Sequence, residues 1–439
     1  MTHIVRRVAV RPPAAALAAA LLVAVLLPAA DAGAATFGRF QRGGRGVSQV
    51  GAFVARADGP AAVYYNPAGL TEVPGFQVEA GLDFSNATDE LSDASGTYRA
   101  DHSIQFPPYL YLSWSDPERS GDWALGIGID TPHWDRADWD PVFFPLRFTT
   151  RLNEVEVWEV HPILAYRVSD GWSFGGGLRY QIGSATWGRN HQLAIAATPD
   201  GPFFPFEYTA DADADVDGYG FDAGVQYRST LWGFGAVYRS EVELEGDGEL
   251  DVELRDPPAD PSLVPSAEGV IRRLPRGFDT RFDSPREVVA GLWFAPYPEL
   301  RFEVDAALVA WSDAAHSVSR SFMNVGPGFT RSTVDLHGGW DDTVSVRLGV
   351  EGDLGDFMAL SGGVAWEPSP VPDGRVDPAW PRGDAIVYAL GMSFNYERVS
   401  FDLGYSFHDH DELGTATPAG RATFSSEEQA WSASARWRF

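Results

Sequence analysis

The sequence predicts an all-β fold: a 14-stranded antiparallel transmembrane β-barrel with an N-terminal plug, or hatch, inside its lumen. Three observations predict it. The chain opens with an export signal, most later residues alternate between apolar and polar, and the connections between alternating segments are short and long in turn. Together these features are typical of barrels in the bacterial outer membrane. We divide the 439 residues into a signal peptide (1–34), a hatch (35–74) and a barrel (75–439).

The signal peptide is predicted from the first residues. Arg6, Arg7 and Arg11 precede an apolar run over 14–28, and small residues follow as far as Ala35. A positive start, an apolar centre and a small-residue cleavage site define a secretory signal. The alternative, a signal-anchor helix, is less favoured because the apolar run is short. We therefore expect an exported protein of the bacterial cell outer membrane.

The composition limits the partners. Asp and Glu number 61 against 33 Lys and Arg, Cys is absent, and the chain holds 27 Phe, 15 Trp and 15 Tyr. The acidic balance argues against nucleic acid as a partner. Many aromatic residues suit the girdles at the two faces of a membrane barrel. We expect contacts with outer-membrane lipid and lipopolysaccharide, no cofactor, and a monomer.

The barrel strands are predicted from a side-chain period of two, which defines a β-strand. In 76–84 and again in 399–407, apolar residues occupy one face and small or charged residues the other. A secreted β-sandwich would also alternate, but these segments exceed the usual strand length of about 5–6 residues. The fourteen segments are 75–87, 103–116, 121–131, 151–168, 171–190, 214–229, 231–247, 286–296, 299–312, 342–354, 356–367, 384–397, 398–410 and 423–439.

The segment before the first strand does not alternate. Residues 36–74 are rich in Gly and Ala and carry several Phe and Tyr, which would be exposed if the segment hung free in the periplasm. We therefore place it in the lumen. Asn66-Pro67 predicts a turn, because Pro restricts the residue before it and Asn bonds nearby backbone. The hatch motif that we single out consists of Tyr64, Tyr65, Asn66, Pro67, Ala68 and Gly69.

Several stretches resemble the FadL-type family of outer-membrane transporters for long-chain fatty acids and other hydrophobic compounds. They are "ADGPAAVYYNPAGL" at 57–70, "DSPREVVAGLWFAPYPELRFEVDAALVAWSD" at 283–313, "WDDTVSVRLGVEGDL" at 340–354 and "VAWEPSPVPDGRVDPAWPRGD" at 364–384. The resemblance spans residue 36 to Phe439. It implies a fourteen-strand barrel with a hatch, the same number of strands that the alternation predicts.

The resemblance also implies a route. External loops capture an apolar molecule, it binds against the hatch, and a kinked third strand opens a lateral gap toward the bilayer. By position the third strand is 121–131, with Gly126, Gly128 and Asp130 as the lateral-gap residues. The sequence departs from the family because Pro132 follows this strand instead of interrupting it. A second interpretation is that the small residues only make room for the plug.

Two aromatic stretches are predicted to lie in external loops. Exposed apolar clusters of this kind indicate an interaction surface, here a groove that captures an apolar ligand; loops packing on one another over the mouth is the alternative. The capture residues are Trp134, Trp139, Phe143, Phe144, Leu146, Phe148, Phe203, Phe204 and Phe206. Arg147 and Arg151 flank the first stretch and could bind a carboxylate in a two-pronged way, or pair with loop acids.

Three further motifs are weaker. "GWSFG" around Ser173 matches a nucleophile elbow, but that motif needs a helix after the turn, and a strand is predicted here. The acidic run from Asp211 to Gly218 lacks the twelfth-position Glu of a calcium loop; a solvated acidic rim is favoured, and a divalent cation or a bridge to lipopolysaccharide is the alternative. His408 and His410 share one strand face as a possible metal pair, but we read them as a loop edge and assign no metal site.

The predicted function is passive transport of hydrophobic small molecules, long-chain fatty acids or aromatic and aliphatic hydrocarbons, and not catalysis. Two alternatives remain. A barrel enzyme acting on lipid would use His408 or His410 with a serine such as Ser406, in hydrogen-bond reach. A general porin for hydrophilic solutes would need an unobstructed lumen, which the N-terminal segment argues against.

Overall fold

The computed structural model describes residues 41–439, apart from 102–104, 117–121, 197, 199–200, 275, 315, 324–328, 336–338 and 373–374. The predicted signal peptide and the first residues of the hatch lie outside the described residues. The described strands join into one antiparallel sheet that closes on itself. None of the helices in the described part of the chain is long and apolar enough to cross a membrane.

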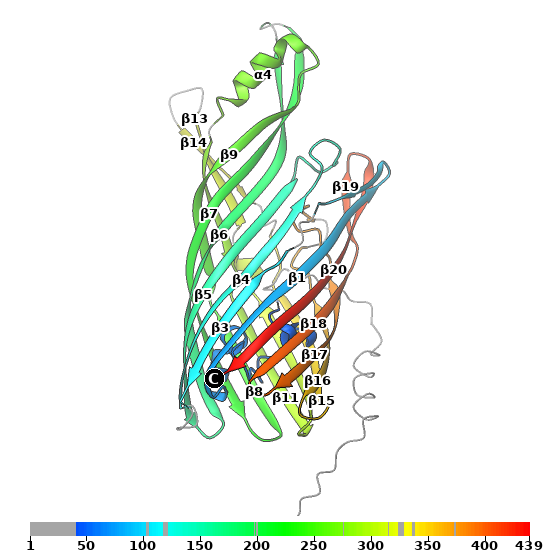
Figure 1. Cartoon of the computed structure of the whole chain (residues 1–439). Helices are drawn as coiled ribbons and strands as arrows, with labels where there is room; N and C mark the ends of the chain where they lie inside the picture. The colour runs from blue at the N-terminus through cyan, green and yellow to red at the C-terminus, as the bar shows by residue number, and fades with distance from the viewer. Residues whose placement is uncertain are drawn as a thin grey trace, which may run out of the picture.

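Fourteen of the described strands form the closed ring, each hydrogen-bonded to the next and the last to the first (Figure 1). They are β1 (Gly75–Asp93), β3 (Pro108–Ser115), β4 (Trp123–Asp138), β5 (Leu152–Ser169), β6 (Trp172–Ala196), β7 (Phe203–Arg228), β8 (Trp232–Arg239), β11 (Glu287–Tyr297), β12 (Leu300–Val309), β15 (Thr343–Asp353), β16 (Met358–Glu367), β17 (Ala385–Tyr396), β18 (Val399–His410) and β20 (Gly420–Arg438). Closure comes from β1 and β20, which pair from Gln77↔Arg438 to Ser92↔Thr423. The predicted fold is confirmed.

Six more strands extend the wall beyond the ring at the end with the longer connections. They are β2 (Gly96–Arg99), β9 (Val242–Asp256), β10 (Gly277–Ser284), β13 (His316–Met323), β14 (Phe329–Asp335) and β19 (Leu413–Thr417). A 3-10 turn (η2, Pro261–Leu263) and a helix (α4, Val264–Ile271) cap this end, and a third short turn (η3, Trp311–Asp313) follows β12. Much of what alternation alone predicts as loop is therefore strand.

The strands are polar inside and apolar outside. In β18, Ser400, Asp402 and Ser406 are buried toward the lumen, whereas Phe401 and Leu403 are about half exposed on the outer surface. A ring of this kind hydrogen-bonds each strand to its neighbours and has no first or last strand, which hydrocarbon requires. The exposed apolar band therefore marks the surface that faces lipid.

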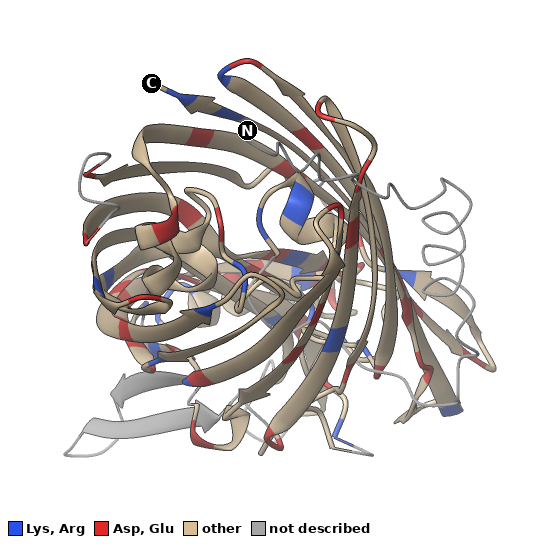
Figure 2. Ribbon diagram, turned by 90° about the horizontal axis from the view of Figure 1, so that it is seen from below, with Lys and Arg blue, Asp and Glu red and all other residues tan. Residues whose placement is uncertain are grey.

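The hatch lies inside the ring, toward the end that carries the C-terminus (Figures 1 and 2). Its described part runs from residue 41 to the start of β1 and forms α2 (Gly44–Ser48), α3 (Ala62–Tyr65) and η1 (Pro67–Glu72). Nearly all of its side chains are buried. Helix α2 packs on β16, β17, β18 and β20, and η1 packs on the opposite wall, against β3 to β7.

Glycines in the wall bring the hatch backbone close to the strands. A Cβ on Gly235 of β8 would stand 2.3 Å from the carbonyl oxygen of Val54, and one on Gly175 of β6 would stand 2.6 Å from the amide nitrogen of Ala68. These distances are well inside van der Waals contact, so a side chain at either position displaces the hatch. Glycine is needed here for close approach and not for backbone conformation.

We expect Gly235→Val to fold as a barrel but to loosen the hatch, because overpacking of this kind costs about 1–3 kcal/mol. Limited proteolysis of the purified protein should cleave the hatch faster, and single-channel conductance should rise. Gly414→Val is the matched control, since a Cβ on Gly414 of β19 meets nothing within 4 Å. Equal protease resistance of the two variants would contradict the glycine contact.

Candidate functional site: the hatch and the wall beside it

The Asn66-Pro67 turn ties the hatch together and to the wall. Asn66 Oδ1 accepts from the amide of Ala68 at 3.2 Å, and Nδ2 donates to the carbonyls of Val54 and Val225, at 2.9 and 3.0 Å. Pro67 begins η1, where its missing N–H costs nothing. Of these bonds, local sequence predicts only the first; the link to Val225 of β7 depends on the fold.

The two tyrosines before the turn pack within the hatch. The hydroxyl of Tyr65 donates to the carbonyl of Arg42 at 2.8 Å and accepts from its amide at 2.9 Å. The Tyr65 ring meets Phe53 and Tyr64 edge-to-face, with centroids 5.2 and 5.0 Å apart. Tyr65 therefore ties the described N-terminal end of the hatch to α3.

Side chains from the wall satisfy the hatch backbone. Asp305 Oδ2 of β12 accepts from the amides of Phe53 and Val54, at 2.9 and 3.0 Å. Glu303 Oε1, two residues earlier on the same strand face, accepts from the next two amides, at 2.7 and 3.2 Å. Four successive hatch N–H groups are thus bound by two buried carboxylates.

The carbonyl groups of the hatch are bound by two donors from the wall, the amide of Gln226 and the guanidinium of Arg239. Gln226 Nε2 of β7 donates to Ala55 and Arg56, at 3.0 and 2.9 Å. Arg239 of β8 donates to the carbonyls of Tyr64 and Tyr65. Buried backbone groups must be paired, and here the wall supplies the partners that a hatch without sheet structure lacks.

A charged cluster fixes the other side of the hatch. Arg45 binds Asp58 at 2.8 Å and Glu351 of β15 at 3.0 Å. Burial alone would raise the pKa of Asp58, but the guanidinium groups of Arg45, Arg56 and Arg228 lower it well below its ordinary value. The carboxylate of Asp58 therefore remains charged within the hatch.

The wall changes its pairing beside the hatch. The β3–β4 ladder covers Ala124 to Ile129, and the next bridge on that side of β4, among the described residues, joins Asp138 to Asp101. The β4–β5 ladder shifts register between Asp130 and His133, which marks a bulge. We call residues 131–137 of β4 the edge stretch.

Pro132 lies within the edge stretch. The expectation that Pro132 follows the third strand is wrong, because β4 continues to Asp138. A proline has no N–H to give to a ladder and is tolerated at edges and bulges. The three lateral-gap residues lie just before it: Gly126 and Gly128 face Val63 of the hatch, and Asp130 accepts from the Tyr111 hydroxyl at 3.1 Å.

Arg42 of the hatch spans this region from the lumen. Its Nη1 binds Asp83 of β1 at 2.8 Å, and its Nη2 donates to the carbonyl and hydroxyl oxygens of Thr131 in the edge stretch. The side chain is fully buried. Arg42 therefore links the hatch to β1 and β4 at the level where β3 no longer pairs with β4.

An apolar groove of about 850 Å³ lies on the outer face of the barrel, over β1, β20, β18, β17 and β16. Its lining includes Leu82, Phe84, Phe106, Leu403 and Trp431. Phe106, which precedes β3, meets Phe84 with ring centroids 5.3 Å apart. The groove thus begins next to the wall region where β3 and β4 part.

Four of the predicted capture residues lie in two separate clusters. Trp139 and Phe144 stack at 4.4 Å in one buried cluster, and Leu146 packs against it. Phe206 belongs to another, with Ala267 and Ile271 of α4. Phe203, Phe204 and Phe206 were expected in a loop, but they lie in β7, because the β6–β7 ladder extends to Ala196↔Phe203. The loop expected for Trp134 is wrong as well, because β4 continues past it to Asp138 and pairs it with Glu156 of β5.

Some of these aromatic residues are open to solvent. Phe143 and Phe203 are 73% and 72% exposed, and Phe148 is 39% exposed. Trp134 and Phe204 are half-buried. Packing within the two clusters thus accounts for Trp139, Phe144 and Phe206, while Phe143, Phe148 and Phe203 present the apolar surface.

Both candidate carboxylate contacts already have acidic partners. Arg147 binds Glu207 with two nitrogens, at 3.1 and 3.0 Å. Arg151 binds Asp138 at 2.9 Å and Asp211 at 2.5 Å. A ligand carboxylate would have to replace one of these acids.

The structure also shows where two of the weaker motifs lie, the one around Ser173 and the acidic run that begins at Asp211. Ser173 of β6 is buried and shares a 2.7 Å hydrogen bond with Thr71 of the hatch, a structural contact. The acidic run extends along β7, where Asp213 and Asp215 line a polar groove with Asp247 and Asp251 of β9.

Comparison with known proteins finds relatives by sequence among long-chain fatty acid transport proteins. The long-chain fatty acid transport protein of Escherichia coli is 24% identical over 295 residues, which cover 61% of this chain and 62% of the relative. The chain thus spans less than two thirds of the curated relatives that it matches.

Solved structures share the fold. A Pseudomonas aeruginosa FadL homologue superposes with a TM-score of 0.75 at 18% identity, over 92% of this chain and 99% of its own. The P. putida toluene transporter TodX gives 0.69 at 16% identity, over 91% and 98%.

A family model, described as outer membrane protein transport protein (OMPP1/FadL/TodX), matches residues 23–439. This span includes the hatch, the edge stretch of β4 and the whole ring. The chain therefore belongs to the OMPP1/FadL/TodX family of outer membrane transport proteins.

Proposed function

We propose that this protein passively transports hydrophobic small molecules, long-chain fatty acids or aromatic and aliphatic hydrocarbons, across the outer membrane. The observation that carries the proposal is the change of wall pairing beside the hatch, where the β3–β4 ladder ends at Ile129 and Arg42 reaches across to Thr131. Relatives named as a long-chain fatty acid transport protein and a toluene transporter support the cargo class.

Capture is the first step. The exposed rings of Phe143, Phe148 and Phe203 offer an apolar contact at the outer mouth, where a ligand leaving water gains about 25 cal/mol per Å² of buried apolar surface. Arg147 or Arg151 would take a fatty-acid carboxylate by exchanging an acidic partner for it. An uncharged hydrocarbon needs no such exchange.

Binding against the hatch and sideways release follow. Nearly all described side chains of the hatch are buried inside the ring, which favours a lateral route over a straight aqueous one. Asn66 and the tyrosines before it hold the hatch in the shape against which the ligand would bind. Release past the edge stretch of β4 would bring the ligand to Phe106 and the apolar outer groove, so the cargo stays in apolar surroundings.

The barrel-enzyme alternative has one observation in its favour. Ser406 Oγ lies 3.1 Å from His408 Nε2, in hydrogen-bond reach. Ser406 is only 1% exposed, however, so a lipid ester could not reach its hydroxyl in this conformation. Loss of a lipase activity in Ser406→Ala would be needed to revive that alternative.

The test that decides the proposal is mass spectrometry of small molecules that co-purify with the detergent-solubilised barrel. A variant lacking residues 36–72 is the control. We expect fatty acids or hydrocarbons bound to the intact protein and absent from the variant, since the hatch forms part of the binding surface. No apolar ligand in the intact protein, together with steady ionic conductance, would instead support a hydrophilic porin.

Asn66→Ala is expected to leave the barrel folded but to reduce uptake severalfold. The carbonyls of Val54 and Val225 lose their donor, at a cost of about 1–3 kcal/mol for each buried group left unsatisfied. Uptake of a fluorescent long-chain fatty acid at equal surface abundance measures the effect. Asn395→Ala, on a half-exposed residue in β17, is the control, and normal uptake by Asn66→Ala would refute the proposed role.

Arg42→Met is expected to increase uptake, because the tie between the hatch and the edge stretch is lost. It also leaves the Asp83 carboxylate buried without its cation, which costs about 3–5 kcal/mol, so the double variant with Asp83→Asn separates gating from instability. Arg286→Met, which removes an exposed pair with Asp313, is the control. Unchanged uptake in the folded double variant would show that Arg42 does not restrain the opening.

A further inference from the structure

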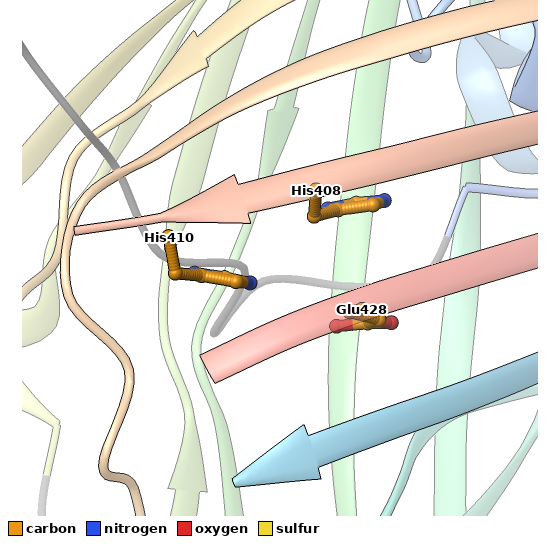
Figure 3. A group of neighbouring side chains, drawn as sticks. All are labelled: His408, His410 and Glu428. Carbon is orange, nitrogen blue, oxygen red and sulfur yellow. The ribbon is translucent and has the colours of Figure 1, made fainter. Parts of the chain in front are cut away.

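Three side chains with metal-binding atoms meet on the lumen side of the wall, at the outer end of β18. They are His408 and His410 of β18 and Glu428 of β20 (Figure 3). Their ligand atoms lie within 4.8 Å of one another, and the residues are 4%, 8% and 4% exposed. This cluster is not part of the hatch contacts described above.

The fold explains why the three meet. Residues two apart on a strand share a face, and the rings of His408 and His410 stack with centroids 6.3 Å apart and planes at 18°. His408 lies directly opposite Glu428 in the β18–β20 register. The sequence shows the histidine pair, but only the register supplies the third side chain.

The orientation of His410 suits a ligand. Its Nδ1 lies 3.3 Å from the carbonyl oxygen of Gly383, and a carbonyl can only accept, so Nδ1 carries the proton. Nε2 then presents a lone pair, and this buried atom has no hydrogen-bond partner among the described residues. Metal-binding histidines commonly donate their other N–H to a backbone carbonyl in this way.

Neighbours also hold the other two groups. Ser406 Oγ lies 3.1 Å from His408 Nε2, and Ser85 Oγ donates to Glu428 Oε1 at 2.8 Å. Such outer contacts orient ligands before a metal arrives.

The charges around the cluster favour a cation. Arg382 lies 3.5 Å from Glu428, but it also lies 3.5 Å from Asp89 and 3.4 Å from Asp135. The carboxylates of Glu428, Asp89 and Asp135 and the guanidinium of Arg382 together carry a net charge of minus two. A divalent ion would balance that charge.

We propose that His408, His410 and Glu428 bind a divalent transition metal ion of the zinc class. Two imidazoles and a carboxylate are a common zinc donor set with one position left open, and the imidazoles disfavour Ca²⁺ and Mg²⁺, which take oxygen ligands. Tetrahedral zinc separates its donors by about 3.3 Å, so closing the site needs side-chain shifts of up to roughly 1.5 Å. The bound ion ties the outer ends of β18 and β20 together.

The experiment uses the full-length barrel in detergent, stripped with EDTA and carried on a tag without histidine. Titration with Zn²⁺ in a calorimeter should give one site per chain. His410→Gln and His408→Gln should each weaken binding at least about tenfold, while His191→Gln, outside the cluster in β6, should not. Retained heat-modifiability on SDS gels shows that each variant folds. The amide of Gln in His410→Gln can still donate to the carbonyl of Gly383.

Cu²⁺ provides a second readout, because electron paramagnetic resonance reports the nitrogens around it. The spectrum should show two imidazole nitrogens in the native chain and one in either single variant. No Zn²⁺ binding, or binding that persists in both variants, overturns the proposal. Neither measurement depends on transport, so this outcome is separate from the fate of the proposed function.

Discussion

The amides of Phe53, Val54, Ala55 and Arg56 have no strand to pair with, and Asp305 and Glu303 accept all four. A hatch of short helical turns can lie inside a barrel only if the wall provides such partners. A buried backbone N–H or C=O group without a hydrogen bond destabilises the fold. The position of the hatch therefore depends on the register of β12. A slip of one residue would turn both carboxylates toward lipid and remove the seat on which Asn66, Tyr65 and Arg42 depend.

The ring could be predicted from sequence because lipid imposes a strict pattern on it. Outward residues such as Phe401 and Leu403 must be apolar and the residues between them need not be, so period two appears throughout the membrane. Beyond the lipid this constraint ends. In β7, Ala212 and Ala214 face inward while Asp213 and Asp215 face water. The strand still alternates, but its outward side chains are acidic, and an acidic stretch of sequence resembles a loop. This is why the strands extend further than the sequence indicated.

The site was less predictable, and the reason is distance along the chain. The Asn66-Pro67 turn is local and its Oδ1 bond to Ala68 follows from residue type. The bond between Arg42 and Thr131 spans 89 residues, and that between Phe53 and Asp305 spans 252. Period two tells which face a side chain occupies, but not which hatch group lies opposite. For the same reason the sequence does not predict that Glu428 lies beside His408 and His410, because only the β18–β20 register brings them together.

The length of β7 sets how far this protein stands out from the cell. Its 26 residues cover about 86 Å at about 3.3 Å each, or roughly 65 Å of height at a tilt of about 40°, whereas the lipid-facing band of such barrels is only about 25 Å tall. Most of the β6–β7 hairpin is thus expected outside the bilayer, and it extends well past the shorter strands of the ring (Figure 1). An antibody or a bacteriophage approaching the cell would meet this acidic hairpin before it met the membrane.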